Sequence, residues 1–360
     1  MTGMSPRERI LRAMRRQKPD RVPREASFTP PLLETFRQKT GQDDPAAYFA
    51  MDRRAVDFKR PQPPADFSRY LPTVPEGAVV DEWGNLVVHG FQYETTDYVY
   101  PMRGLLTVAE LAEFPFPDFY QDQCHAHLEQ DIQSYHDQDL AVTGSLWGTL
   151  FEHAWHMRGM DNLFIDFYDR PEFATALLDR MTAIRSFQAT RYAQAGVDIL
   201  HVGDDIGTQN RPMMSIPLWQ RWFKLRLAQV IQAARRVKPD IVVEYHSDGY
   251  IEPFIPDLIE IGINVLNPVQ PECMDPAAIK RKYGDRLAFS GTVGTQTTMP
   301  FGTPDEVRQV VAERIRTVGY DGGLVLAPTH ILEPDVPWEN VIAFFEAAEE
   351  SGYYASPQLQ

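Results

Sequence analysis

From residue 139 onward, short runs of β-branched and apolar residues alternate with longer stretches in which apolar residues recur at helical spacing. The runs have the length of buried strands, and the longer stretches have the length of helices. Alternation of this kind is typical of βαβ units and predicts a parallel sheet. The predicted strands are 140–143, 199–202, 241–244, 263–266, 287–289 and 324–326.

Two predicted helices carry clear start signals. Ser5 is followed by proline and then by Glu8, the arrangement of a capping box at a helix N-terminus. Thr303, again followed by proline, stands three residues before Glu306. The second signal predicts a helix over 304–318, which the glycine at 319 would end.

Residues 57–120 lack this regular alternation. We interpret them as loops and hairpins on a larger body, so the chain is predicted to be one domain over residues 1–360. Residues 1–120 would hold the first helix, the first strand and irregular loops, and residues 121–350 the regular units. The length leaves open a division into two domains near residue 120.

Polar residues collect just after the C-terminal ends of many predicted strands. Neither glycine-rich phosphate-binding motif, GxGxxG or GxxxxGK[ST], is present, which disfavours an open nucleotide-binding sheet. Side chains that converge from many strand ends are typical of the top face of a (β/α)₈ barrel, so the predicted fold is an α/β TIM barrel. These residues are Ser145, Trp147, Asp204, Asp205, Gln209, His246, Asp248, Asn267, Gln270, Thr292, Thr295, Thr329 and His330.

Composition narrows the class of function. Lys and Arg total 35 and Asp and Glu total 50, so the net charge is −15, which disfavours nucleic acid and anionic membranes as partners. Two cysteines are too few for a disulfide framework. The longest uncharged stretch, 287–304, is rich in Gly, Thr and Pro, and the N-terminus lacks the apolar core of a signal peptide. We therefore expect a cytoplasmic protein without membrane spans.

The first candidate site combines His246 and Asp248 with His330. Residues two apart on a strand point to the same face, so His246 and Asp248 would share a metal or a proton. With His330 from another strand end, they form a two-histidine, one-carboxylate set that suits a metal with open positions. Alternatively, Asp248 caps a following helix and His330 is a surface loop residue.

The second candidate is the pair Asp204 and Asp205. One of the two would act as a general base or orient a basic group, which makes both candidate catalytic residues. The alternative is that Asp205 only stabilises a turn. A third candidate is the helix 152–159, which would present Glu152 at the barrel mouth.

Together these segments resemble the uroporphyrinogen decarboxylase superfamily along nearly the whole chain. The resemblance implies a (β/α)₈ barrel, a site at the strand C-termini and a homodimer. It also implies one of two chemistries, cofactor-free decarboxylation of uroporphyrinogen or methyl transfer between a corrinoid protein and a thiol at a zinc site. The similar segments are 5–13, 19–23, 81–84, 152–159, 203–209, 246–249, 266–270 and 322–340.

The chain departs from both branches. Where decarboxylases carry an arginine-rich motif, residues 24–30 offer only Arg24. The methyltransferase zinc ligands map onto His246, Asp248 and His330, which replace thiolates by harder donors. The resemblance thus implies Zn²⁺ and a small methylated alcohol or ether as substrate, with cobalamin on a partner protein as methyl acceptor.

Two alternatives stay open: a cofactor-free decarboxylase that acts on a polycarboxylate, and a non-catalytic binding barrel. On the preferred interpretation, His246 and His330 join the aspartate pair as catalytic residues. The predicted substrate-binding residues are Trp147, Glu152, Gln209, Asn267, Gln270 and Thr292.

Overall fold

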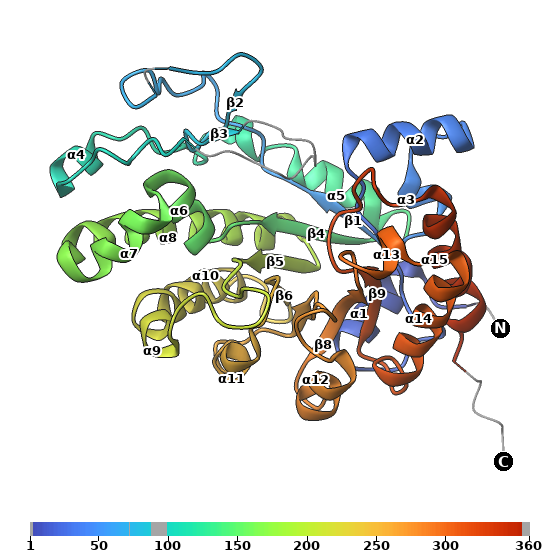
Figure 1. The fold of residues 1–360 in the computed structure, drawn as a ribbon. Coiled ribbons are helices and arrows are strands. Elements are labelled where there is room, and N and C mark those ends of the chain that lie inside the picture. Colours follow the sequence, from blue (N-terminus) through green and yellow to red (C-terminus); the bar gives the residue numbers. More distant parts are fainter. Residues whose placement is uncertain (1–2, 72, 88–98, 355–360) are drawn as a thin grey trace.

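A curled parallel sheet forms the centre of the molecule in the computed structural model (Figure 1), which describes residues 3–71, 73–87 and 99–354. Its seven strands are hydrogen-bonded in the order β1-β4-β5-β6-β7-β8-β9, and every pair is parallel. The six strands predicted from the sequence are confirmed. The strands are β1 (Arg53–Val56), β4 (Ala141–Leu146), β5 (Ile199–Gly203), β6 (Val242–His246), β7 (Val265–Asn267), β8 (Ala288–Val293) and β9 (Leu324–Pro328).

An extended N-terminal segment runs beside β9, beyond the last strand of the sheet. Arg24 forms a parallel bridge with Leu326, and the Leu326 N–H donates to the carbonyl oxygen of Pro23 at 2.8 Å. On its other side, the Arg24 N–H donates to the Asp52 carboxylate next to β1, at 3.1 Å. The described residues therefore form a barrel-like α/β fold of seven paired strands and one bridging segment.

Helices flank the outer side of the sheet (Figure 1). In the described part of the chain, no helix combines the length and the apolar character needed to cross a membrane. The helices are α1 (Pro6–Met14), α2 (Pro30–Thr40), α3 (Pro45–Tyr48), α4 (Val108–Ala112), α5 (Leu128–His136), α6 (Phe151–Arg158), α7 (Met160–Asp169), α8 (Pro171–Ala195), α9 (Ile216–Trp219), α10 (Leu225–Arg235), α11 (Ile255–Glu260), α12 (Pro276–Tyr283), α13 (Thr298–Phe301), α14 (Pro304–Thr317) and α15 (Trp338–Ser351).

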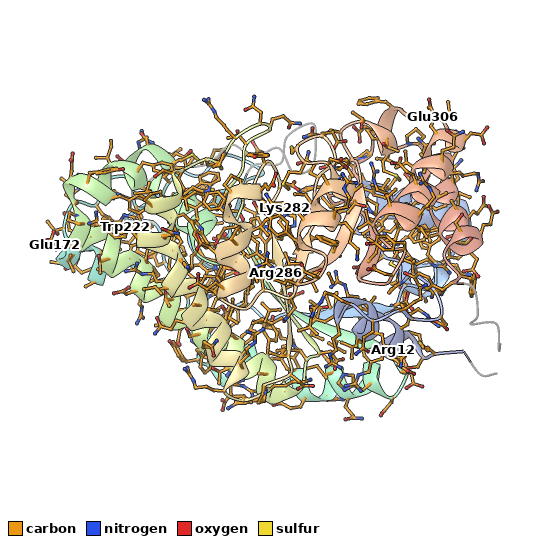
Figure 2. All side chains as sticks on the ribbon, turned by 90° about the horizontal axis from the view of Figure 1, so that it is seen from below. Arg12, Glu172, Trp222, Lys282, Arg286 and Glu306 are labelled. Atoms are coloured by element: carbon orange, nitrogen blue, oxygen red, sulfur yellow. The ribbon has the colours of Figure 1, made fainter. Side chains whose placement is uncertain are left out.

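Helix α14 begins as its sequence predicts. The Thr303 hydroxyl accepts the Glu306 N–H at 3.3 Å, and the Glu306 carboxylate accepts the Thr303 N–H at 2.7 Å. Both halves of a capping box are therefore present. Figure 2 shows Glu306 at one end of the molecule and Glu172, in the first turn of α8, at the other.

Helix α1 closes the N-terminal end of the barrel-like sheet. The Ser5 hydroxyl caps it by accepting the Glu8 N–H at 3.2 Å. Its buried apolar face packs on a single layer of apolar side chains, one from each of six strands. These side chains fill this end of the sheet. That layer consists of Ile10, Ala13 and Met14 from α1 with Ala141, Ile199, Val242, Val265, Ala288 and Val325 from the sheet.

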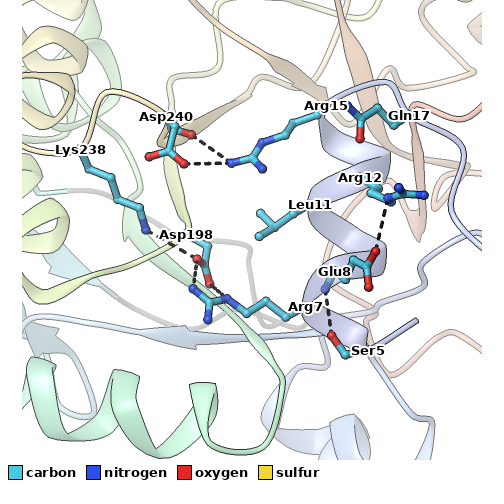
Figure 3. A pocket seen from close by; sticks show the side chains of 10 residues that line it. All are labelled: Ser5, Arg7, Glu8, Leu11, Arg12, Arg15, Gln17, Asp198, Lys238 and Asp240. Atoms are coloured by element: carbon cyan, nitrogen blue, oxygen red, sulfur yellow. Dashed lines mark hydrogen bonds and ion pairs between the residues drawn. The ribbon is translucent and has the colours of Figure 1, made fainter. Parts of the chain in front are cut away.

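A cavity of about 530 Å³ lies beside α1 at this closed end (Figure 3). Each of its basic side chains faces a carboxylate, so the lining offers no free cation among the described residues, and the pairs of Arg7 and Arg15 connect the α1 region to residues just before β5 and β6. The pairs are Arg7–Asp198 at 2.8 Å, Arg12–Glu8 at 3.5 Å, Arg15–Asp240 at 3.2 Å and Lys238–Asp198 at 3.6 Å. We therefore expect the candidate site at the opposite end of the sheet, where the strands end.

Candidate active site

A cavity of about 480 Å³ opens where the strands end. Its lining comes from loops and strand ends that are far apart in the sequence, as expected for the mouth of a barrel. Four of the predicted site residues line it: Trp147, His246, Asn267 and His330. Six further polar residues share the lining without having been predicted as catalytic, substrate-binding or metal-binding residues: Glu25, Ser27, Arg53, His201, Ser290 and Thr329.

Three side chains meet at the rim of this cavity, and we call them the rim triad: Asp205, His246 and Asp248. One donor atom from each lies within 4.8 Å of the others. His246 Nε2 is 3.7 Å from Asp205 Oδ1, which also accepts the Asp248 N–H at 2.7 Å. The buried Oδ1 atom of Asp248 has no hydrogen-bond partner among the described residues. One imidazole and two carboxylates, with an unsatisfied oxygen, fit a divalent cation.

Glycine allows the two loops of the rim triad to come together. Gly249, which follows Asp248, has a φ of +80°, a conformation that favours glycine. A Cβ added there would lie 2.6 Å from the backbone of Gly207. The loops after β5 and β6 therefore touch through backbone atoms, and this contact brings Asp205 next to Asp248.

Asn267 fixes the orientation of His246. Its Nδ2 donates to the carbonyl oxygen of Ser290 at 3.0 Å, so its Oδ1 is the atom that faces His246 Nδ1, at 2.5 Å. Because Oδ1 accepts, the proton of a neutral His246 ring sits on Nδ1 and the Nε2 lone pair faces Asp205. Burial lowers the pKa of His246, but the neighbouring Asp248 and Asp205 carboxylates raise it overall.

The two adjacent aspartates, Asp204 and Asp205, make different contacts. The Asp204 carboxylate accepts the backbone N–H groups of Leu150 and Glu152, both at 3.0 Å, and thereby satisfies the N-terminus of α6. Burial raises the pKa of Asp204 to about 7. Asp204 therefore positions a helix, whereas Asp205 belongs to the rim triad.

Glu152 brings another carboxylate toward the rim triad from α6. It is buried, and its Oε2 atom has no hydrogen-bond partner among the described residues. Burial and the nearby carboxylates of Asp205, Asp204 and Asp248 raise its pKa well above the usual value, although the Asp205 N–H donates to it. This concentration of carboxylates favours a positive charge at the rim.

A second polar group lies on the cavity side of the sheet. Arg53 on β1 forms ion pairs with Glu25 and with Glu244, the latter at 2.7 Å. His201 Nδ1 lies 3.0 Å from the same Glu244 oxygen. Burial would raise the pKa of Glu244, but Arg53 and His201 hold it far below the usual value. Glu244 is therefore ionised and shared by two basic groups.

Three of the predicted substrate-binding residues, Gln209, Gln270 and Thr292, lie outside the cavity lining. Gln209 is exposed and bonds to Gln296, and Gln270 accepts the Gly249 N–H at 3.1 Å, which braces the loop of the rim triad. Thr292 is fully buried with a φ of +129°. His330 lines the cavity but is not one of the three donors that meet at the rim. Its role as a metal ligand stays a prediction.

The unpredicted residues did leave a signal in the sequence. Glu244 and Arg53 are charged residues inside short strands, and Glu244 stands two positions before His246. Side chains two apart on a strand share a face, so Glu244 could have been assigned to the same cavity as His246. A charge at such a position is rarely buried without a paired partner, and this would have prompted a search for Arg53.

Comparison with known families now identifies the fold family. Residues 100–351, more than half of the chain, match the family model described as uroporphyrinogen decarboxylase (URO-D). The chain belongs to the uroporphyrinogen decarboxylase family. The resemblance predicted from the sequence motifs is thereby confirmed.

The relatives are distant. The chain is 23% identical over 222 residues to the uroporphyrinogen decarboxylase of Pelodictyon phaeoclathratiforme, covering 60% of each chain. It is 26% identical over 187 residues to that of Legionella pneumophila, covering 51% of this chain and 49% of the relative. The chain thus spans about half to three-fifths of the length of these curated relatives.

A solved methyltransferase from Methanosarcina mazei has a similar structure, with a TM-score of 0.64 and 19% sequence identity. The match covers 96% of this chain and 99% of that protein. At this identity the likeness establishes a shared fold along the chain.

Proposed function

We propose that this protein is a metal-dependent methyltransferase or demethylase, which moves a methyl group from a small substrate to cobalamin on a partner protein. The observation that carries the proposal is the rim triad, in which Asp205, His246 and Asp248 present donor atoms within 4.8 Å at the mouth of a cavity. In this proposal residues 22–25 act as the eighth strand and close the barrel around that mouth.

The donor set fits Zn²⁺. His246 offers Nε2, because Asn267 occupies Nδ1, and Asp205 and Asp248 offer carboxylate oxygens. The partnerless Oδ1 of Asp248 is the buried acceptor that a cation would satisfy. Bound there, Zn²⁺ would act as a Lewis acid toward the heteroatom that carries the methyl group.

The protein's own groups position the substrate. Trp147, Ala327 and Pro328 contribute apolar surface to the cavity lining, which also contains polar groups. This combination fits one small molecule with an apolar body and a polar end. His246 belongs both to the rim triad and to the cavity lining, so it places the reacting end of that molecule at the rim.

The charged groups that line the cavity disfavour uroporphyrinogen as the substrate, although the curated relatives are named uroporphyrinogen decarboxylases. A substrate with eight carboxylates requires guanidinium groups at the mouth. The only arginine in the lining of the described cavity is Arg53, and its guanidinium already contacts Glu25 and Glu244. Arg24 does not line the cavity, since it bonds to Phe49 and Glu349.

Metal content and methyl transfer test the proposal together. Protein purified without added metal should contain about one zinc per chain by elemental analysis, and His246→Ala should lose it. With a panel of small methylated alcohols, ethers and amines, the wild type should convert free cob(I)alamin to methylcobalamin, followed by absorbance. The proposal fails if the protein binds no metal and instead forms coproporphyrinogen at about 1 s⁻¹ or faster.

A further inference from the structure

Two carboxylates share one guanidinium on the cavity side of the sheet. We define the floor cluster as Glu25, Arg53, His201 and Glu244, of which the first three line the cavity. Arg53 is its only guanidinium and contacts both Glu25 and Glu244. Burial raises the pKa of Glu25, and the neighbouring Glu244 adds to the rise while Arg53 opposes it. One guanidinium therefore serves the fully buried carboxylate of Glu244 and the partly buried carboxylate of Glu25.

Two carboxylates thus face one guanidinium, and the floor cluster is negative overall as long as its one imidazole, His201, is neutral. The Oε1 atom of the fully buried Glu244 also has no hydrogen-bond partner among the described residues. Buried acceptors of this kind call for a donor or a cation.

Trp147 supplies a second, independent feature of the same cavity. This large aromatic side chain lines the cavity, yet 51% of its surface is exposed. The face of an indole ring attracts organic cations, and an aromatic wall above carboxylates is a common way to bind an ammonium group.

We propose that the floor cluster and Trp147 bind a positively charged organic group, so that the substrate is a small organic cation such as a protonated or quaternary amine. The assignment as substrate rests on the proposed function, whereas the binding of the cation does not. The ring centroids of His201 and His246 are 6.0 Å apart, so one small molecule spans the distance from the floor cluster to the rim triad. Its charged end lies at the floor and its methylated end at the rim.

Three probes that share a phenyl ring but differ in charge test the charge preference of the cavity: benzylamine, benzyl alcohol and benzoate. Their affinities are measured by isothermal titration calorimetry on the full-length protein with chelator present, so that a metal at the rim does not contribute. We expect benzylamine to bind most tightly and benzoate at least about tenfold more weakly, because like charges across an interface repel strongly. Equal affinities for the three probes, or a preference for benzoate, would overturn the proposal.

Variants locate the binding. Glu25→Gln should weaken benzylamine binding about threefold to tenfold and strengthen benzoate binding, because it removes one floor charge. Asp240→Asn removes the same charge at the closed end of the sheet, where Asp240 pairs with Arg15, and should change neither affinity. If both variants act alike, the preference reflects net charge and the floor cluster is not the site.

Trp147→Leu keeps the test valid should Glu25→Gln fail to fold, because the Trp147 side chain is half exposed. It should weaken benzylamine binding more than benzyl alcohol binding, by about threefold. Zinc binding to Glu25→Gln and Trp147→Leu should stay at the wild-type level. Loss of charge preference with normal zinc binding refutes only the cation site, whereas charge preference without zinc binding refutes only the proposed function.

Discussion

His246 Nδ1 lies 2.5 Å from Asn267 Oδ1, and this contact decides which ring nitrogen of His246 faces the rim triad. Asn267 is in turn fixed by its bond to the Ser290 carbonyl oxygen at 3.0 Å. Asn267 at the end of β7 thus orients His246 at the end of β6, because the two strands pair through these residues. Asn267 was predicted to bind substrate, and the structure gives it this orienting contact as well.

Removing this contact should weaken metal binding. Asn267→Ala leaves the His246 ring free to rotate, so zinc affinity measured by titration should fall about tenfold to a hundredfold. The ring ¹⁵N chemical shifts of His246 should show a mixture of tautomers in place of one. Asn264→Ala is the matched control, because Asn264 lies just before β7, at the opposite end of this strand from Asn267, where it accepts the Val243 N–H at 2.9 Å. Unchanged affinity together with a single tautomer in Asn267→Ala would contradict the assigned role.

The adjacent aspartates should separate stability from metal binding. Asp204→Ala removes the acceptor for two backbone N–H groups of α6 and should lower the free energy of unfolding by about 2 kcal/mol. Asp204→Asn keeps an acceptor there and should recover most of that loss. Asp205→Asn should change stability by less than about 0.5 kcal/mol while lowering zinc affinity at least about tenfold. Denaturant unfolding and metal titration check both, and a large stability loss in Asp205→Asn would make Asp205 structural.

His330 tests the ligand set that the sequence predicts. If His330 is a metal ligand, His330→Ala should lower zinc affinity at least about tenfold, comparable to the loss in Asp205→Asn. His330 lines the cavity but does not belong to the rim triad, so the two variants discriminate between the two sets. Zinc titration of each variant at one pH is sufficient. A loss below about threefold in His330→Ala removes it from the ligands.

Much of the architecture was predictable because it is encoded locally. Alternating runs gave the strands, and the signals at Ser5 and Thr303 gave the two helix starts, since a cap depends on residues only three positions apart. The extended N-terminal segment beside β9 was harder to predict from the sequence. The segment at Arg24 joins β9 from the other end of the chain, and no local pattern records such a partner.

The candidate site was predictable in part for the same reason. His246 and Asp248 were placed together because they are two residues apart on a strand end. Arg53 and Glu25 were not, because their significance comes from contacts with each other and with Glu244, far away in the sequence. The division of labour between Asp204 and Asp205 also depends on where α6 begins in space, which the sequence does not specify.

His156 should make stability fall on the acid side of neutrality. It lies on α6, is 3% exposed, and burial lowers its pKa to about 3. In the unfolded chain its pKa is near the usual value of about 6.5. Below that pH the unfolded state takes up a proton that the folded state does not. The contribution of His156 to stability is therefore complete above pH 6.5 and is lost as the pH falls toward 3.

The comparison of wild type with His156→Gln isolates this contribution. Other buried groups around α6 also affect the curve: Asp204, which bonds to the N-terminus of α6 and has a raised pKa of about 7, favours the folded state at lower pH. We therefore expect the stability advantage of the wild type over His156→Gln to shrink by up to about 1.4 kcal/mol per pH unit between pH 6.5 and 5. Denaturant unfolding at several pH values measures it. Parallel stability curves for the two proteins would show that His156 titrates normally in the fold.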